Sequence, residues 1–364
     1  MEIALDEKLF QDLYPYIVDD NVTDIRWNGR ALWIEDLKKG RYKSDVVLTA
    51  EFLNIFTGTI ANNANVNFNA SQSSLQAETR ELRIHAVHPS RTGDHTYILA
   101  IRKTPAVARL NDVTVEQQGY ADKFTRLLLR ALVKGHCSGI IIGDVGAGKT
   151  ELEKYLASFL PENETIMTVE DTLEMKLPEL YPTKDISAVK ISADYPAEQA
   201  IRDALRLLVK YLLIAEARGR EIARIMEGAS TGCTAITTIH AANVWEIPDR
   251  VVQMAGSEAD SNSFENDVYT FFDFGVKVAK KVTEHGVERK IDQICFFDRQ
   301  DKVNKAYIFM KNGKLTGEIV PKAIIEKFDK DDVETQPLLA TLTLMELEKA
   351  KQEEAKQKEK EEKH

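Results

Sequence analysis

Residues 143 to 150 read GDVGAGKT and directly follow the apolar run Gly139 to Ile142. The spacing G-x-x-x-x-G-K-[ST] is typical of a loop whose backbone N–H groups surround phosphate oxygens. Its glycines permit backbone conformations that a β-carbon would obstruct. The apolar run predicts a strand, and residues 151 to 160 predict a helix whose positive dipole end faces the anion. A strand, this loop and a helix in succession predict an α/β domain that binds a nucleotide.

The polar side chains of the loop have expected partners on the ligand. Lys149 reaches the β- and γ-phosphates of a nucleoside triphosphate as a point charge, and the hydroxyl of Thr150 is placed to bind Mg²⁺. We predict that the nucleotide-binding residues are Gly143, Asp144, Val145, Gly146, Ala147, Gly148, Lys149, Thr150 and Glu151.

The composition is that of a soluble globular protein. Hydrophobic residues make up 43% of the 364 residues and charged residues 29%. The longest apolar stretches, 127 to 133 and 205 to 217, are broken by Lys or Arg and fall short of the roughly 20 apolar residues of a membrane span. The N-terminus shows no basic flank and apolar core of a secretory signal. We therefore expect a cytoplasmic protein without a transmembrane segment.

The net charge of −10 bears on the class of partner. Because binding to duplex DNA through its phosphates needs a concentrated basic surface, no direct sequence-specific nucleic-acid binding is expected. Cys137, Cys233 and Cys295 are far apart and match neither a disulfide framework nor a zinc site. We expect them to be small buried residues.

The first hundred residues predict a separate α+β domain. VTDIRWNG and RALWIED are β-rich runs separated by the turn signal Asn28-Gly29, which favours a hairpin. Apolar residues at helical spacing predict a helix from Ala50 to about Asn63, and ELRIHAVHP and TYILAIRK predict two alternating strands. We expect an N-terminal domain over residues 1–104 and a linker over residues 105–119.

From Tyr120 onward, helices alternate with short apolar strands, which predicts a mostly parallel sheet covered on both faces. The apolar runs are Gly139 to Ile142, Thr165 to Glu170, Tyr211 to Glu216 and Thr234 to His240. The predicted divisions are a nucleotide-binding domain over 120–300, an accessory region over 301–344 with a turn at Asn312-Gly313, and a charged tail over 345–364. The tail is nearly all Glu, Lys, Gln and Ala, so we expect a solvated helix or a disordered segment.

Acidic residues end two of these runs, at the edge where open α/β sheets bind ligands. Glu170 or Asp171 is placed to position Mg²⁺ or a water, although both acids equally fit a cap of the next helix. Glu216 is placed to polarise an attacking water. The alternative for Glu216 is an ion pair with Arg218 or Arg220.

His240 ends the last of these runs. A single histidine at a strand end is more often structural than catalytic. Its neighbours Thr237 and Thr238 suggest a polar patch that faces the same crevice, which favours a role for His240 in sensing the γ-phosphate.

In chain order, the phosphate loop, VEDTLE, IAEAR and TTIHA resemble the secretion traffic ATPases, which serve type II secretion, type IV pili, Tad pili and conjugative type IV secretion. The resemblance covers roughly Val22 to Gln293. It implies a RecA-like P-loop ATPase domain, a smaller N-terminal α+β domain, and ATP with Mg²⁺ as ligands. It also implies a homo-hexameric ring that is bound peripherally, through partners, to the membrane components of a secretion system.

The resemblance also implies roles for single residues. TVEDTLE is similar to the acidic box of the family, which makes Glu170 catalytic and places Thr150, Glu170 and Asp171 near Mg²⁺. LLIAEAR resembles the Walker B strand and makes Glu216 the catalytic glutamate, and TTIHA resembles the histidine box that contains His240.

Arginines of the N-terminal domain and linker reach the phosphates in this family, and Arg83 and Arg102 occupy matching positions. Guanidinium groups clamp phosphate oxygens and couple domain closure to the nucleotide state. The resemblance therefore adds these two arginines to the predicted catalytic residues.

The chain departs from the family pattern at four places. Val209-Lys210 stands where Pro-Asp is common, Ala215 and Ala235 where Gly is usual, and Cys233 where His is usual. An added methyl costs little at an ordinary backbone conformation and more at positive φ. Lys210, beside an acidic crevice, is expected to form a salt bridge or to lower turnover.

The favoured function is a cytoplasmic, ATP-hydrolysing hexameric motor that energises assembly or substrate transfer by a membrane-embedded secretion system. Conjugative type IV secretion is preferred, because the chain is short and lacks a four-cysteine metal module. A Tad-like pilus motor is the nearest alternative. A weakly hydrolysing scaffold that regulates a secretion channel is a second one, kept open by Lys210, Ala215 and Cys233. A DNA-translocating helicase is disfavoured by the acidic balance.

Overall fold

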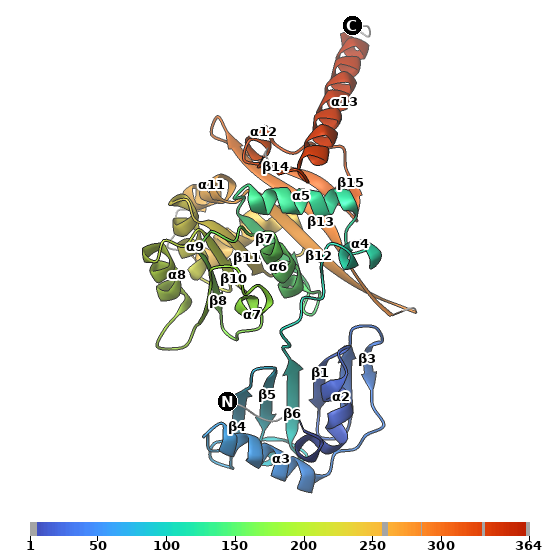
Figure 1. Ribbon diagram of the computed structural model, residues 1–364, viewed down its shortest axis with the longest axis vertical. Coiled ribbons are helices and arrows are strands. Elements are labelled where there is room, and N and C mark those ends of the chain that lie inside the picture. The colour runs from blue at the N-terminus through green and yellow to red at the C-terminus, as the bar shows by residue number, and fades with distance from the viewer. Residues whose placement is uncertain (1–5, 257–260, 285, 330–331, 362–364) are drawn as a thin grey trace. The chain divides into compact units, whose positions relative to one another are not determined.

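The computed structural model describes residues 6–256, 261–284, 286–329 and 332–361. The chain forms two compact units, drawn in Figure 1. Unit 1 contains the residues up to Ala106 together with Lys281–Glu288, and unit 2 contains Val107–Lys280 together with the residues from Arg289 onward. Among the helices of the described ranges, none is long and apolar enough to cross a membrane.

Unit 1 is an antiparallel sheet packed against short helices. Its strands lie in the order β3-β2-β1-β6-β5-β4. The strands are β1 (Val22–Trp27), β2 (Leu32–Asp36), β3 (Gly40–Lys43), β4 (Ser74–Glu78), β5 (Leu82–Val87) and β6 (Ile98–Lys103). The helices are α1 (Glu7–Phe10), η1 (Gln11–Leu13), α2 (Tyr14–Val18), α3 (Ala50–Asn63) and η2 (Pro89–Arg91). One buried core joins apolar side chains of the sheet to those of α1, α2 and α3.

The local predictions for unit 1 are confirmed where the sequence pattern is strong. Strands β1 and β2 pair as an antiparallel hairpin, and Gly29 in its turn has φ +94°. Helix α3 spans the predicted range, and β5 pairs with β6. The sequence analysis did not predict β3 and β4, because these edge strands are short and carry polar residues.

Unit 2 is built on a mixed sheet in the order β15-β14-β13-β12-β7-β11-β10-β8-β9. Neighbours from β12 to β9 pair in parallel, whereas β13, β14 and β15 pair antiparallel. The first strands are β7 (Gly139–Gly143), β8 (Ile166–Glu170), β9 (Ile186–Lys190), β10 (Tyr211–Ile214) and β11 (Thr234–Ile239). The later strands are β12 (Phe274–Thr283), β13 (Gly286–Gln300), β14 (Val303–Lys311) and β15 (Lys314–Leu315). The predicted turn at Asn312-Gly313 is confirmed, since both residues have positive φ between β14 and β15.

Helices cover both faces of this sheet, as the sequence predicted (Figure 1). Helices α5 (Lys123–Lys134) and α6 (Lys149–Ser158) share one core with Ile141 of β7. The other core contains Ile140 and Ile142 with the helices α8 (Ala197–Arg206), α9 (Glu221–Ser230), α10 (Ile247–Ala255) and α11 (Ser261–Phe271). A strand buried on both faces has no polar alternation, which explains the continuous apolar run before the phosphate loop.

The remaining helices of unit 2 are short, except the last. They are α4 (Thr114–Gln117), α7 (Leu177–Leu180), η3 (Val244–Glu246), α12 (Lys322–Ile325) and α13 (Gln336–Glu361). Leu338 and Leu342 of α13 are buried in the core that contains α5, and Lys349 lies 2.7 Å from Glu318. The helix therefore passes without a break through residue 345, where the sequence analysis began the charged tail.

Candidate nucleotide site

The loop between β7 and α6 has the backbone of a phosphate cradle. Gly143, Gly146 and Gly148 have φ of +155°, +71° and +100°. A β-carbon on Gly143 would lie 2.6 Å from the carbonyl oxygen of Val278 on β12. All three positions therefore favour glycine for its conformation, and Gly143 also requires it for space.

Lys149 begins α6, and its side chain lies against the loop. Its Nζ donates a hydrogen bond of 2.9 Å to the carbonyl oxygen of Gly143. Burial lowers the pKa of Lys149, while the charges of Glu216, Asp144 and Glu153 act in the opposite direction. An ammonium group that is half removed from water beside a ring of backbone N–H groups fits the phosphates of a nucleotide.

The rest of the predicted loop residues differ in exposure and position. Asp144 and Val145 are exposed at the tip, whereas Ala147 is buried. Thr150 and Glu151 stand in the first turn of α6, where Glu151 pairs with Lys154 at 3.0 Å.

Parallel pairing brings the predicted catalytic residues to the same edge of the sheet. Ile142 lies beside Ile239 of β11, and Ile214 of β10 lies between Thr237 of β11 and Val169 of β8. The residues that follow these positions therefore leave the sheet together, next to the phosphate loop.

Glu216 is the centre of this edge. Its Oε2 accepts a hydrogen bond of 2.8 Å from Nη2 of Arg218, and its Oε1 lies 3.1 Å from Nε2 of His240. Burial raises the pKa of Glu216, but the hydrogen bond and charge of Arg218, with the charges of His240 and Lys149, lower it below its ordinary value. The carboxylate is therefore held ionised beside the loop.

Arg218 connects this carboxylate with the acidic box. Its Nη1 lies 3.4 Å from Oδ2 of Asp171, on the loop after β8. The sequence analysis considered Arg218 only as a structural partner of Glu216. Its position two residues after a strand-end glutamate is the signal that marks it as a member of the site.

The two threonines of the histidine box do not form the expected polar patch. Both are buried, and their hydroxyls donate to the carbonyl oxygens of Ile214 and Ala215. The expectation that Thr237 and Thr238 face the crevice is therefore wrong. Their hydrogen bonds join the ends of β10 and β11, which fixes the separation of Glu216 and His240.

Glu170 is buried and fully hydrogen-bonded within its own segment. One oxygen accepts from the hydroxyl of Thr168 at 2.8 Å, and the other accepts from the backbone N–H groups of Glu174 and Met175 at 2.8 and 2.9 Å. Burial raises its pKa, and these three hydrogen bonds lower it. These contacts hold the loop after β8, and so Asp171, in place. They are not a cap of the next helix, because α7 begins at Leu177 without a side-chain cap. A place for Glu170 near Mg²⁺ stays a prediction.

Glu153 is a buried carboxyl group that the sequence analysis missed. It lies one turn after Lys149 on α6, its side chain is fully buried, and neither oxygen has a hydrogen-bond partner within the described part of the chain. Burial, and next the charge of Glu170, raise its pKa well above the ordinary value. The only signal in the sequence is an acid on the inward face of an otherwise apolar helix stripe.

We expect Glu153→Gln to stabilise the protein in a pH-dependent way. The folded state holds the carboxyl proton of Glu153 more tightly than the unfolded state does. The stability of the wild type therefore falls as pH rises above 4.5, the ordinary pKa of a glutamate, and through the raised pKa of the folded state. The amide has no such proton to lose. Its advantage should be small near pH 5 and about 1–2 kcal/mol at pH 8.

Urea unfolding of both proteins across this pH range measures the difference. Glu326→Gln, at an exposed glutamate, is the matched control and should leave the profile unchanged. Parallel wild-type and Glu153→Gln profiles would contradict a buried, protonated Glu153.

The departures from the family pattern lie away from this edge or are unstrained. Lys210 precedes β10 and Cys233 precedes β11, at the opposite ends of these strands from Glu216 and His240. The expectation that Lys210 stands beside the acidic crevice is therefore wrong. Ala215 and Ala235 are not among the described residues that have positive φ. Their methyl groups therefore cost little compared with the glycine that is usual there.

The predicted arginines belong to the sheet of unit 1. Strand registers place a row of charged residues side by side from β4 to β3: Glu78, Arg83, Arg102, Asp24, Glu35 and Arg41. Nε of Arg102 lies 2.8 Å from Oδ1 of Asp24, and half of the Arg102 side chain is exposed. Whether Arg83 and Arg102 reach the phosphates stays a prediction.

Fold and loop together define a RecA-like P-loop ATPase. Residues 64–312 match the family model described as Type II/IV secretion system protein. The chain belongs to this family of secretion ATPases, and it is an ATPase that binds nucleotide.

Individual relatives are distant. An uncharacterized protein of Bacillus anthracis is 25% identical over 300 residues, which cover 77% of this chain and 67% of the relative. A putative conjugal transfer protein of Mycobacterium tuberculosis is 24% identical over 251 residues, covering 66% and 71%. The X-ray structure of the ATPase DotB of Legionella pneumophila has a TM-score of 0.59 at 18% identity and covers 93% of this chain and 87% of that one. This structural likeness shows the fold.

Proposed function

We propose that the protein is an ATP-hydrolysing homo-hexameric motor that energises substrate transfer by a conjugative type IV secretion system at the cytoplasmic face of a membrane. The observation that carries the hydrolytic part is the cluster of Glu216, Arg218, Asp171 and His240 beside Lys149. The conjugative assignment rests on the family and on the relative whose name describes conjugal transfer. A Tad-like pilus motor is the nearest alternative.

The proposed chemistry follows from the charges at this edge. Glu216 is ionised and orients the attacking water and accepts its proton, while His240 fixes the direction of the carboxylate. Thr150 and Asp171 would hold Mg²⁺ through the bound nucleotide, where the ion would supply positive charge next to the phosphates. Glu170 supports Asp171 from within the loop, through the hydrogen bonds to Glu174 and Met175.

The location of the unusual residues favours the motor over a weakly hydrolysing scaffold. Lys210 and Cys233 stand at the amino ends of β10 and β11, and Ala215 has an ordinary backbone conformation. None of the three therefore gives a physical reason for slow hydrolysis.

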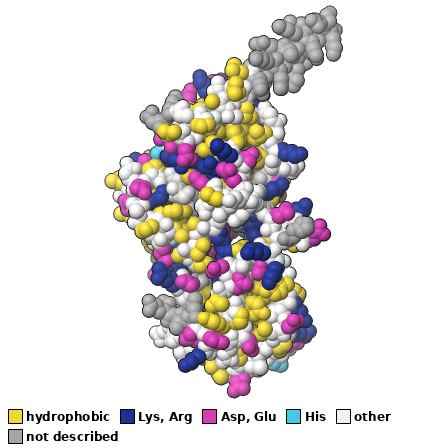
Figure 2. Space-filling view, turned by 45° about the vertical axis from the view of Figure 1, so that its right-hand side comes forward, with side chains coloured by type: hydrophobic (Ala, Val, Ile, Leu, Met, Phe, Trp, Pro, Cys, Tyr) yellow, Lys and Arg dark blue, Asp and Glu magenta, His cyan; other side chains and the backbone are white. Residues whose placement is uncertain are grey.

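Nucleic acid is not proposed as a partner. On the face drawn in Figure 2, basic and acidic side chains are interspersed and do not form one basic patch. This arrangement, with the net charge of −10, supports protein components of the membrane machine as the partners.

Phosphate release by the purified protein with ATP and Mg²⁺ tests the proposal, together with its oligomeric mass with and without nucleotide. We expect steady release and a mass of six chains. Wild-type release no faster than that of Lys149→Ala would overturn the hydrolytic part, and a monomer under all conditions would overturn the ring.

Arg102→Ala should lower ATP turnover by roughly 10- to 100-fold without unfolding unit 1, because a guanidinium bound to phosphate contributes about 1.5–3 kcal/mol. Arg41→Ala is the matched control, since Arg41 is another arginine of the same charged row. Turnover is measured as phosphate release, and folding by circular dichroism. Unchanged turnover in Arg102→Ala would remove this residue from the site.

A further inference from the structure

Two cations of unit 2 stand at the phosphate loop on the side opposite the hydrolytic groups. A β-carbon on Gly146 would lie 3.6 Å from Nζ of Lys280, and a β-carbon on Gly148 would lie 3.6 Å from Cδ of Arg289. Nε of Arg289 donates a hydrogen bond of 3.4 Å to the carbonyl oxygen of Gly146. Neither residue was singled out by the sequence, because both lie far beyond the loop in the chain.

Strand pairing explains why these side chains reach the loop. Strand β12 runs parallel to β7 with Val278 beside Gly143, so Lys280 lies two residues further on, at the level of the loop. Arg289 is on β13, the next strand of the sheet. Two residues after Arg289, the N–H of Ile291 donates a hydrogen bond of 2.8 Å to the carbonyl oxygen of Tyr120. This bond holds β13 in place near Arg289.

A buried polar group lies near the same place. The hydroxyl of Tyr120 is inaccessible to solvent and has no hydrogen-bond partner among the residues that the structure describes. Burial and the charge of Glu151 raise the pKa of Tyr120, and the charge of Arg289 lowers it. The charges of Arg289 and of Glu151, in the first turn of α6, therefore both act on this hydroxyl.

The order of the strands separates two sides of the loop. Strand β7 lies between β11 and β12. Glu216 and His240 follow β10 and β11 on one side, where the terminal phosphate must lie to be attacked. Lys280 and Arg289 come from β12 and β13 on the other side.

We propose that Lys280 and Arg289 bind the phosphates of the nucleotide on the β12 side of the loop, at the part that ATP and ADP share. The inference rests on the proposed function and adds two ligand-binding residues to it. Arg289 exchanges its hydrogen bond with Gly146 for a charge-assisted one to a phosphate oxygen. Because the interaction is the same before and after hydrolysis, it contributes uniform binding and leaves the chemical step unchanged.

The test is the affinity of the full chain for ADP and for a non-hydrolysable ATP analogue, measured by calorimetry. Arg289→Gln and Lys280→Gln should each lower the affinity for both ligands by a similar factor, roughly five- to ten-fold. KM for ATP should rise by the same factor while kcat changes less than about two-fold. Arg289→Lys, which keeps the charge, should recover much of the loss.

Matched controls are available next to each residue. Lys290 follows Arg289 on β13 and lies near Gly313, and Lys281 follows Lys280 on β12. Successive side chains of a strand alternate between its two faces, so Lys290 and Lys281 project from the face opposite to Arg289 and Lys280. Lys290→Gln and Lys281→Gln should bind nucleotide as the wild type does. Thermal melting confirms that each variant is folded.

Pyrophosphate separates a contact with phosphate from a contact with the nucleoside. Its affinity should fall in Arg289→Gln by the same factor as that of ADP, and an unchanged pyrophosphate affinity would overturn the phosphate assignment. A variant with normal affinity but lower kcat would place Arg289 at the reacting phosphate and overturn the uniform-binding role. Normal ADP binding by both glutamine variants, beside a wild type that binds and hydrolyses ATP, would overturn this inference alone. A wild type that binds neither ligand would overturn the proposed function as well.

Discussion

Replacing Glu216 by Gln is expected to lower the rate of ATP hydrolysis by about two to three orders of magnitude while ATP binding stays near the wild-type level. The amide has the same shape, and its oxygen still accepts the hydrogen bond of Arg218, which is 2.8 Å long in the wild type. It has no negative charge to orient a water or accept its proton. The loss therefore appears in kcat and leaves KM almost unchanged.

The control for this variant removes a charge from the other end of the same strand. Lys210 precedes β10 and its side chain is exposed. Lys210→Ala should hydrolyse ATP within about two-fold of the wild-type rate, as surface changes away from a site usually do. Both variants are compared with the wild type by single-turnover phosphate release and by ATP binding. Glu216→Gln with near-normal turnover would show that another group activates the water.

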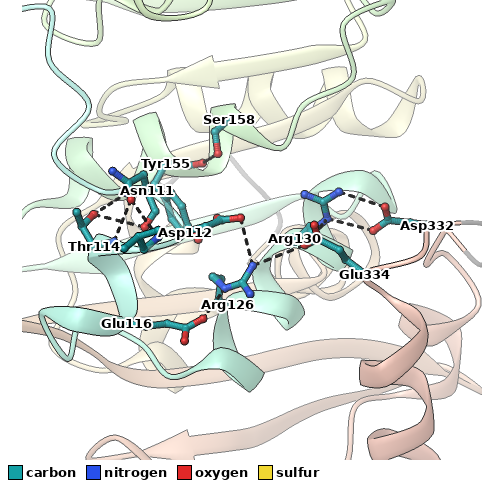
Figure 3. Close-up of polar contacts among 11 residues, drawn as sticks. Asn111, Asp112, Thr114, Glu116, Arg126, Arg130, Tyr155, Ser158, Asp332 and Glu334 are labelled. Carbon is teal, nitrogen blue, oxygen red and sulfur yellow. Dashed lines mark hydrogen bonds and ion pairs between the residues drawn. The ribbon is translucent and has the colours of Figure 1, made fainter.

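Asp332→Asn should have the largest effect on stability, with a loss of roughly 2–3 kcal/mol and a melting temperature lower by about 5–10 °C. Figure 3 shows the contacts between Asp332 and Arg130 that this change weakens. Nε and Nη2 of Arg130 each lie 3.1 Å from the carboxylate of Asp332, and Nζ of Lys134 lies 2.9 Å from it. The side chains of Asp332 and Arg130 are only 9% and 19% exposed, so Arg130 would keep its longer contact to Glu334, at 3.6 Å, in a poorly solvated place.

The pH dependence of this effect has a definite sign. The hydrogen bond of Arg130 is the largest cause that holds the pKa of Asp332 below its ordinary value of 3.8. The unfolded chain therefore binds this proton more readily than the folded protein. The stabilisation is complete at neutral pH and is lost as pH falls below about 4, so the two proteins should converge in acid.

Thermal melting between pH 2 and pH 7 measures how the difference between the two proteins narrows below about pH 4. Asp301→Asn is the matched control, because Asp301 is exposed and its φ of +51° suits asparagine equally well. A loss of stability that is the same at every pH would indicate a packing defect instead of a lost charge pair.

The same network connects the segment just before α13 with the phosphate-binding helix. Arg126 of α5 contacts Glu334 at 3.7 Å and Asp112 at 3.2 Å, and Asp112 accepts a hydrogen bond from the hydroxyl of Tyr155 on α6 (Figure 3). Composition alone suggested a solvated helix or a disordered segment from residue 345 onward. The turns of α13 before that residue bury Leu338 and Leu342 in the nucleotide-binding core, and the acids just before the helix pair with the arginines of α5.

Local sequence determined the parts of the site that depend on a single segment. GDVGAGKT between an apolar strand and a helix specifies a phosphate loop, because the positive φ values and the nearby backbone of Val278 exclude other residues at its glycines. The acids and the histidine at strand ends were predictable for a similar reason. Parallel strands expose their carboxyl ends at one edge, so strand-end side chains meet there whatever the connections between them.

Tertiary structure decided which side chains meet across segments. Hydrophobic patterning marks Lys210 as the residue before a strand, but the direction of that strand puts it at the edge away from Glu216. Glu153 is an ordinary helix residue until α6 is packed against the sheet, where its carboxyl group loses water without gaining a partner. Lys280 and Arg289 reach the phosphate loop because β12 pairs with β7 and not with β11, the strand before it in the chain. Strand order is set by long-range packing of two cores, and no local pattern in the sequence encodes it.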